Sequence, residues 1–361
     1  MNITFLIGNG FDIAAGIDTS YKSFYKWYCK QPSEKQHIED FKEMIAKDIE
    51  NGGEYWSDFE WGLGRYTEKF LPEAVDDYLD CYDDAQQGIV HYLNDLCKEY
   101  EYDSDKDAIK TAKSSIGAYY DGTSPAKKRI IQQLVNADKA SSSEIHFISF
   151  NYTDILDRYV KLISEGYLQT WKYSNSDRFL KVHSSVIHVH GFLNNYPILG
   201  VNDKSQIANQ AFLEGAVFPN VLIKPQGVTS LGELWHEQAE TVIAQSQIVC
   251  VYGMSLGATD AKWWRKLVEW LKASNSRHII IFWHSKDAPN TISIRNRMMA
   301  ENEVINKFFS YSNLDISTQD VLKSRIHVCI NYEKLFPLRL VKKQDDAVAA
   351  LSHPVERADI L

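Results

Sequence analysis

Two side chains that could move a proton or orient a substrate come directly after apolar runs of the chain. His190 follows Val186–Val189, and Asn151 follows Ile145–Phe150. An imidazole, with an ordinary pKa of about 6.5, can accept a proton near neutral pH, whereas an amide can only hold a hydroxyl group or a water molecule. Each residue also has a structural interpretation, because Asn151 is typical of turns and helix caps and His190 of a satisfied core histidine.

A glycine turn near the start of the chain is a third candidate. The short β-prone run Ile3–Ile7 ends at Gly8-Asn9-Gly10, and Phe11 and Asp12 then lead into an expected helix. A strand, a glycine turn and a helix in this order point backbone N–H groups at a phosphate. The dinucleotide fingerprint Gly-x-Gly-x-x-Gly is incomplete, because Ile13 replaces the third glycine. The Asp12 carboxylate would repel a pyrophosphate, so we expect it to cap the helix or to bind a ribose hydroxyl.

A fourth candidate is the loop Gly253-Met254-Ser255-Leu256-Gly257, which follows the run Ile248–Tyr252 and precedes Asp260. The spacing Gly-x-Ser-x-Gly resembles the nucleophile elbow of serine hydrolases, which also need a histidine later in the chain. Three histidines are available for that role, His278, His284 and His327. This alternative leaves Asn151 and His190 without a function.

The histidines and cysteines do not predict a metal site. His188 and His190 are spaced i, i+2 on an expected strand, which places both rings on one face and resembles a metal-binding pair, but spacing offers no third ligand. The five cysteines are scattered and have no Cys-x-x-Cys spacing: Cys29, Cys81, Cys97, Cys250 and Cys329. They indicate a reducing, cytoplasmic setting, and we expect no metal cofactor.

The elements that must position these residues are strands alternating with helices. We expect strands at Ile3–Ile7, Ile145–Phe150, Val186–Val189, Ile248–Tyr252, His278–Trp283 and Ile326–Ile330, with shorter candidates at Ile198–Val201 and Val221–Ile223. Helices are expected at 155–162 and 259–273. This alternation predicts an open, mostly parallel, Rossmann-like α/β sheet. Ligands bind such sheets at the carboxyl ends of the strands, so the four motifs should surround one crevice.

The region between the first two strands reads as helical. Apolar residues recur at steps of three and four over 75–100, which is typical of an amphipathic helix. We therefore divide the chain into 1–18 (first strand and glycine turn), 19–143 (an all-helical insertion or cap), 144–343 (the remainder of the α/β core) and 344–361 (a polar tail). The insertion is expected to act as a lid. Its residues Trp56 and Glu60 either reach the site or pack within the insertion.

Composition excludes several classes of protein. The chain has 361 residues, 44% of them hydrophobic, and a net charge of −9, which disfavours a nucleic-acid partner. Residues 71–110 hold twelve Asp or Glu against three Lys, as expected for a solvated helix face or an acidic docking surface. No apolar run is long enough for a signal peptide or a membrane span, so we expect no membrane association.

The same motifs, in the same order, resemble the AbiH family of bacterial abortive-infection (phage-defence) proteins. The resemblance is carried by the opening block Ile7-Gly-Asn-Gly-Phe-Asp-Ile-Ala-x-Gly-Ile-x-Thr-Ser-Tyr21, and then by Trp56-x-Asp58-Phe59-Glu60, Phe150-Asn151-Tyr152-Thr153, His188-x-His190-Gly191 and Gly253-x-Ser255-Leu256-Gly257-x-x-Asp260. It runs from the N-terminus to about residue 270. It implies a role in phage defence, with a homo-oligomer or a partner protein of a defence system.

The series is also similar, more distantly, to sirtuin-like domains, which implies NAD+ as the substrate. On that resemblance Asn151 lies beside the nicotinamide ribose and His190 is the catalytic base. The remaining positions that the resemblance brings to the NAD+ site are Gly8, Asn9, Gly10, Phe11, Asp12, Tyr152, Gly191, Gly253, Ser255, Leu256 and Asp260. The four-cysteine zinc module of deacylating sirtuins is missing, which favours NAD+ cleavage over protein deacylation. A module that binds NAD+ or ADP-ribose without cleaving it is the alternative.

Overall fold

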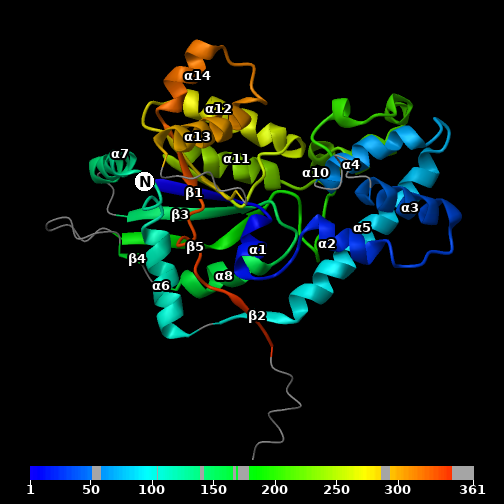
Figure 1. Ribbon diagram of the computed structural model, residues 1–361, viewed down its shortest axis with the longest axis horizontal. Coiled ribbons are helices and arrows are strands. Elements are labelled where there is room, and N and C mark those ends of the chain that lie inside the picture. The colour runs from blue at the N-terminus through cyan, green and yellow to red at the C-terminus, as the bar shows by residue number, and fades with distance from the viewer. Residues whose placement is uncertain are drawn as a thin grey trace, which may run out of the picture.

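The computed structural model describes residues 1–50, 58–103, 105–138, 142–165, 168–169, 179–285 and 293–343. Its strands are β1 (Asn2–Ile7), β2 (Tyr100–Tyr102), β3 (Ser142–Ser149), β4 (Leu168–Gln169), β5 (Phe179–His188), β6 (Ile248–Tyr252), β7 (His278–Trp283), β8 (Ile326–Ile330) and β9 (Leu340–Lys342). Seven of them form one sheet in the order β4-β5-β3-β1-β6-β7-β8 (Figure 1). Six run parallel, and the short edge strand β4 is antiparallel to β5. The α/β prediction is confirmed.

The strand order places a switch point between β1 and β6. From β1 the chain adds β3 and then β5 on one side, and it returns to add β6, β7 and β8 on the other. This is the order of a doubly wound Rossmann-like sheet, in which ligands bind outside the carboxyl ends of the two strands where the direction reverses. The glycine turn after β1 and the loop after β6 meet at that point.

The longest apolar runs gave the best predictions of strands. Observed β6, β7 and β8 coincide with the predicted ranges, β1 begins one residue earlier than predicted, and β5 extends the predicted Val186–Val189 toward the N-terminus. The strands predicted at Ile198–Val201 and Val221–Ile223 are wrong. Only an isolated bridge joins Val201 to Ile223, and helix α9 (Val217–Leu222) occupies most of the second run. Both runs are buried, and burial alone does not distinguish a strand from a short helix.

The other helices lie on both faces of the sheet and beside it. They are α1 (Gly10–Ala15), α2 (Tyr21–Tyr28), α3 (Gln36–Glu50), α4 (Phe59–Tyr66), α5 (Val75–Lys98), α6 (Lys106–Gly117), α7 (Pro125–Ala137), α8 (Ile155–Ile163), α10 (Lys224–Ser230), α11 (Trp235–Gln245), α12 (Ala261–Lys272), α13 (Ile294–Phe309) and α14 (Ile316–Lys323), with 3-10 helices η2 (Thr67–Lys69), η3 (Lys204–Gln206), η4 (Gln210–Glu214) and η5 (Ala258–Asp260). Helices α11 to α14 cover one face of the sheet, and α1, α6 and α8 cover the other (Figure 1). Within the described ranges, no helix combines the length and the apolar character that crossing a membrane requires.

The segment 19–143 packs in two places. Helices α2 to α5 form a separate apolar core with residues between Leu199 and Ile223, and they lie to one side of the sheet (Figure 1). Ala112 and Ile116 of α6 and Ile131 of α7 instead join the core under the sheet. Besides its helices, the described part of the segment contains β2, which pairs antiparallel with β9, and the first residues of β3. The proposed domain boundaries stay a prediction, and Trp56 and the tail from residue 344 lie outside the described residues.

Candidate active site

A cavity of about 370 Å³ opens at the carboxyl ends of β1, β3 and β6. Ten of the thirteen residues predicted for the site line it: Gly8, Asn9, Gly10, Asp12, Asn151, Tyr152, His190, Gly253, Ser255 and Asp260. Phe11 and Leu256 do not line it, because they are buried in the cores on the two sides of the sheet. Gly191 does not line it either, and at its φ of 70° it allows the chain to turn away from β5.

The glycines after β1 and β6 allow two turns to touch. The N–H of Gly10 donates to the carbonyl of Gly253 at 2.8 Å, and the N–H of Gly8 donates to the carbonyl of Tyr252 at 2.9 Å. A Cβ atom on Gly10 would lie 2.6 Å from the Cα of Gly253, a distance that no side chain tolerates. These contacts account for the glycines without a ligand, and they occupy two N–H groups that the sequence assigns to a phosphate.

Asp12 joins the turn after β1 to the turn after β3. Its carboxylate is fully buried; Oδ1 accepts from the Asn151 amide at 3.0 Å, and Oδ2 accepts from the Thr153 hydroxyl at 2.6 Å. Burial raises the pKa of Asp12 to about 7, although the donors from Thr153 and Asn151 oppose the shift. Asp12 therefore holds two loops together rather than capping α1.

Asn151 presents one unused hydrogen-bonding atom. Its amide nitrogen donates to the carbonyl of Gly8 at 3.2 Å and to Asp12. Its Oδ1 is buried and has no hydrogen-bond partner in the described part of the chain. A buried acceptor without a partner is costly, because it has lost its water without gaining a donor. Asn151 lines the cavity, and its carbonyl oxygen is the one hydrogen-bonding atom of this side chain that is left for a ligand.

His190 is a buried, neutral imidazole. Its ring packs edge-on against Phe150 with the centroids 5.4 Å apart, and its Nε2 lies 3.4 Å from Oδ1 of Asp260. Burial, with the positive charges of Lys224 and Lys262 and the nearby His236, holds the pKa of His190 well below its ordinary value. An acceptor carboxylate at Nε2 favours the tautomer with the proton on that nitrogen. Nδ1 is then the nitrogen that can accept a proton.

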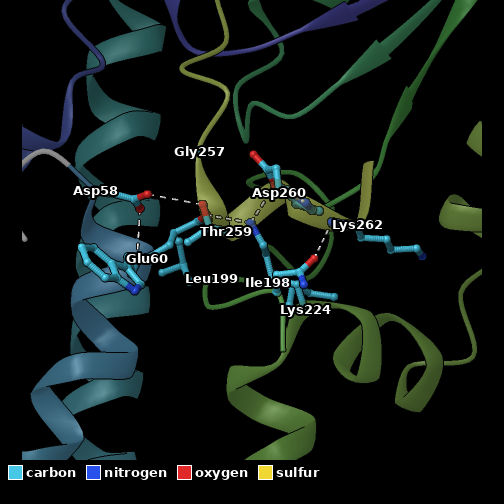
Figure 2. A network of polar contacts seen from close by, with 12 residues as sticks. Asp58, Glu60, Ile198, Leu199, Lys224, Gly257, Thr259, Asp260 and Lys262 are labelled. Atoms are coloured by element: carbon cyan, nitrogen blue, oxygen red, sulfur yellow. Dashed lines mark hydrogen bonds and ion pairs between the residues drawn. The ribbon is translucent and has the colours of Figure 1, made fainter. Parts of the chain in front are cut away.

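A buried ion-pair network lies behind His190 and contains a residue that the sequence did not single out (Figure 2). Lys224 donates to Oε2 of Glu60 at 2.7 Å and to Oδ1 of Asp260 at 3.0 Å. Burial lowers the pKa of the Lys224 ammonium, but the carboxylates of Asp260 and Glu60 outweigh burial and raise it. Burial raises the pKa of Glu60 to about 7 against the attraction of Lys224. The hydroxyl of Tyr152 completes the network by donating to Oε1 of Glu60.

Helix α4 is tied to the loop after β6 by Asp58. One carboxylate oxygen of Asp58 accepts from the backbone N–H of Trp61 at 3.1 Å and caps the helix, and the other accepts from the Thr259 hydroxyl at 3.4 Å (Figure 2). Glu60, in the first turn of the same helix, points toward Lys224 in that view. The segment before β3 therefore supplies one wall of the cavity, as the lid hypothesis requires of Glu60.

Sequence reasoning missed three contributors to the site: Lys224, Thr153 and Thr19, which lines the cavity and whose hydroxyl donates to Oδ1 of Asn9. Thr153 belongs to the block Phe150–Thr153, so its hydroxyl could have been predicted to contribute to the site. Lys224 follows the apolar run Val221–Ile223 and precedes a proline, which is a weak signal for a buried cation. Its partner Glu60 is 164 residues away in the chain, and only the fold brings the two together.

The two alternatives built on histidines gain no support from the geometry. His278 and His327 lie at the amino ends of β7 and β8 and contact each other at 2.9 Å, at the sheet edge opposite Ser255. His284 follows β7 at the same edge as Ser255, but within the described part of the chain no hydrogen bond joins them. His188 bonds to Asp157 at 2.9 Å while His190 faces Asp260, so the two rings do not share a ligand.

Comparison with known proteins identifies the family. No curated protein matches the chain. The family described as bacteriophage abortive infection AbiH matches residues 4–282, a range that contains every residue lining the cavity. That match covers well over half of the chain, from β1 to β7. The chain therefore belongs to the AbiH family of bacteriophage abortive infection proteins.

Proposed function

We propose that this protein acts in abortive infection by hydrolysing the nicotinamide–ribose bond of NAD+. The observation that carries the proposal is that two residues line one cavity at the switch point of the sheet: Asn151, whose Oδ1 has no partner among the described residues, and His190, whose ring is neutral. An acceptor and a base beside the same space are what hydrolysis at a ribose carbon needs. The resemblance of the motifs to sirtuin-like domains supports NAD+ as the substrate.

The fold supports a nucleotide in this place. In sheets of this strand order, dinucleotides bind across the crevice where the order reverses. The volume of about 370 Å³ lies within the range of roughly 300–1,000 Å³ typical of small-molecule sites. Asp260 lines the cavity after the loop Gly253–Gly257, where a carboxylate can accept a hydrogen bond from a ribose hydroxyl.

The proposed reaction breaks one bond of NAD+ and forms one bond to water. The bond between the ribose C1′ and the nicotinamide nitrogen breaks, and nicotinamide leaves with the bonding electrons. A water oxygen then bonds to C1′, and its proton passes to Nδ1 of His190, which gives ADP-ribose and nicotinamide. Asn151 Oδ1 accepts a hydrogen bond from the attacking water or from a ribose hydroxyl. The Asp260 carboxylate, 3.4 Å from Nε2 of His190, favours a proton on that nitrogen and so leaves Nδ1 as the base.

The test is release of nicotinamide from NAD+ by the purified full chain, followed by chromatography. We expect His190→Ala and Asn151→Ala each to lower the rate by about 10²- to 10⁴-fold, the range for loss of a general base or of a group that orients the nucleophile. The matched control is His91→Ala, which removes an exposed histidine of α5. It should leave the rate unchanged.

A second readout separates binding from cleavage. NAD+ at saturating concentration should raise the melting temperature of the wild type, because a ligand that binds only the folded state stabilises it. A raised melting temperature without nicotinamide release would favour a module that senses a nucleotide. The proposal would be contradicted if NAD+ neither raised the melting temperature nor released nicotinamide.

A further inference from the structure

A second cluster of chemically active side chains lies on strands β3 and β5, nearer their amino ends than the cavity. Glu144 and His146 are spaced i, i+2 on β3 and therefore share one face of the sheet. His183 comes from the neighbouring β5. Residues 145 and 147 of β3 pair with 182 and 186 of β5, so three residues of β5 lie opposite His146 alone. Such an irregularity re-aims the side chains next to it, and here it brings His183 to the other two.

The three side chains converge on one point. His183 Nε2 lies 2.8 Å from Oε2 of Glu144, and His146 Nε2 lies 3.8 Å from the same oxygen. The two imidazole rings are stacked with centroids 4.1 Å apart, and all three potential ligand atoms lie within 4.8 Å of one another. The Nε2 atoms of His146 and His183 both face Oε2 of Glu144.

His146 is not satisfied by this arrangement. Its side chain is only 16% exposed, yet within the described residues it makes no hydrogen bond, because 3.8 Å is too long for one. Its contacts in the cluster are the stacked ring of His183 and the long approach to Glu144, so its Nε2 is left for a ligand. A hydrogen-bonded triad would account for His183 and Glu144 but not for the nitrogen of His146 that points at the same oxygen.

We propose that Glu144, His146 and His183 bind one divalent transition-metal ion of the Zn²⁺ class. Two imidazole nitrogens and one carboxylate oxygen are a ligand set that Zn²⁺ takes with four-coordinate geometry, and three protein ligands leave the fourth position to a water molecule. Binding requires His183 and Glu144 to exchange their hydrogen bond of 2.8 Å for bonds to the ion, and His146 to move closer to the carboxylate than its present 3.8 Å. Glu144 and His183 are about one third exposed, so both can move and an ion can enter from solvent.

This site is separate from the histidine pair His188 and His190 weighed from the sequence, and it does not depend on NAD+ hydrolysis. It bears on the candidate active site in one way. Strand β3 continues into Asn151, and β5 continues through His188 into His190. An ion bound here would fasten together the two strands that carry these residues.

The test is a metal titration of the full chain after treatment with a chelator. We expect Zn²⁺ to bind with a stoichiometry of one ion per chain by isothermal titration calorimetry. His146→Ala and His183→Ala should each weaken binding at least tenfold, and Glu144→Gln should also weaken it. His91→Ala, which removes an exposed histidine that faces Asp95 on α5, is the matched control and should not change the affinity.

Cobalt provides a readout that needs no variant. Co²⁺ bound to the wild type should show the visible bands of a four- or five-coordinate ion without a sulfur-to-cobalt charge-transfer band, because no cysteine belongs to the cluster. This spectrum decides the question if a substitution within β3 prevents folding. Absence of binding, binding unchanged in His146→Ala and His183→Ala, or a sulfur band would each overturn the proposal. No nucleotide enters the experiment, so its failure is distinct from failure of NAD+ hydrolysis.

Discussion

The side-chain amide of Asn151 donates a hydrogen bond of 3.0 Å to the buried carboxylate of Asp12 and fixes the turn after β3 to the helix after β1. The same amide donates to the carbonyl of Gly8. Both N–H groups of this side chain are therefore spent on structure, and only Oδ1 remains for a ligand. The pair explains why a carboxylate lies at a position where it would repel a phosphate: Asp12 accepts hydrogen bonds from the turn after β3.

Asp12 should make the stability of the protein fall as pH rises. In the unfolded chain this carboxyl ionises near a pKa of about 3.9, whereas burial raises its pKa to about 7 in the folded protein. Between these values the folded state holds a proton that the unfolded chain has released, so stability declines with pH across that window. We expect Asp12 to remove about 2–3 kcal/mol of unfolding free energy between pH 5 and pH 7.5.

Urea unfolding at several pH values measures this contribution. Asp12→Asn keeps an acceptor for Asn151 but cannot ionise, so its stability should depend less on pH than that of the wild type. Asp18→Asn is the control, because hydrogen bonds from Ser20 and Ser23 outweigh partial burial and lower the pKa of Asp18. An identical pH dependence in the wild type and Asp12→Asn would contradict the prediction.

Lys224→Met should be strongly destabilising. It leaves the carboxylates of Glu60 and Asp260 buried without their cation, and breaking a buried ion pair in this way costs about 3–5 kcal/mol. Adding Glu60→Gln should restore part of the loss, since one unpaired charge is removed. A double-mutant cycle from denaturant unfolding gives the coupling, and strict additivity of the two substitutions would disprove direct pairing. Lys47→Met on the exposed side of α3 should have little effect.

Gly10→Ala should weaken the protein through the contact between the two glycine turns. The new methyl group would lie 2.6 Å from Gly253 Cα, so one backbone must move, at a cost of about 1–3 kcal/mol. Gly117→Ala is the matched control, because a methyl group there meets no atom within 4 Å. It should be neutral or stabilise α6 by about 0.5–1 kcal/mol. Equal melting temperatures for the two variants would argue against the turn contact.

Tyr152→Phe tests the link between the turn after β3 and helix α4. The lost hydroxyl donates to Glu60 and lies 3.0 Å from the carbonyl of Ile198, and the site is buried. Leaving the buried Oε1 of Glu60 without this donor should cost about 1–3 kcal/mol of unfolding free energy. Tyr196→Phe, whose side chain lies on the surface, is the comparison and should change little. If Tyr152→Phe loses no more unfolding free energy than Tyr196→Phe, the hydroxyl of Tyr152 does not stabilise the protein.

The sequence predicted the sheet better than the site, for physical reasons. Continuous apolar runs such as His278–Trp283 must be buried on both faces, and a central parallel strand satisfies that demand. The run Val221–Ile223 has the same composition but is too short to choose between helix and strand, and it became the end of α9. The strands β2 and β9 were not predicted, because each is three residues long.

The position of Asn151 and His190 beside one cavity was predictable, because parallel strands bring their carboxyl ends to one edge of the sheet. What those side chains contact was not. The role of Asp12 depends on hydrogen bonds to residues about 140 positions later, and that of Glu60 on a lysine still further along the chain. Local sequence contains no trace of such pairings, because they exist only once the sheet has assembled.

The central position of β1 has a consequence for synthesis. Ile3 pairs with Ile145 on one side and with Ile248 on the other, so β1 is synthesised before both of the strands that it pairs with. Contacts so distant in the chain form slowly, because closing a long loop costs conformational entropy before the contacts stabilise it. Asp260 is part of the lining of the cavity, so the cavity is complete only after the chain has been synthesised up to that residue. Translation and the appearance of a complete pocket are therefore separated in time.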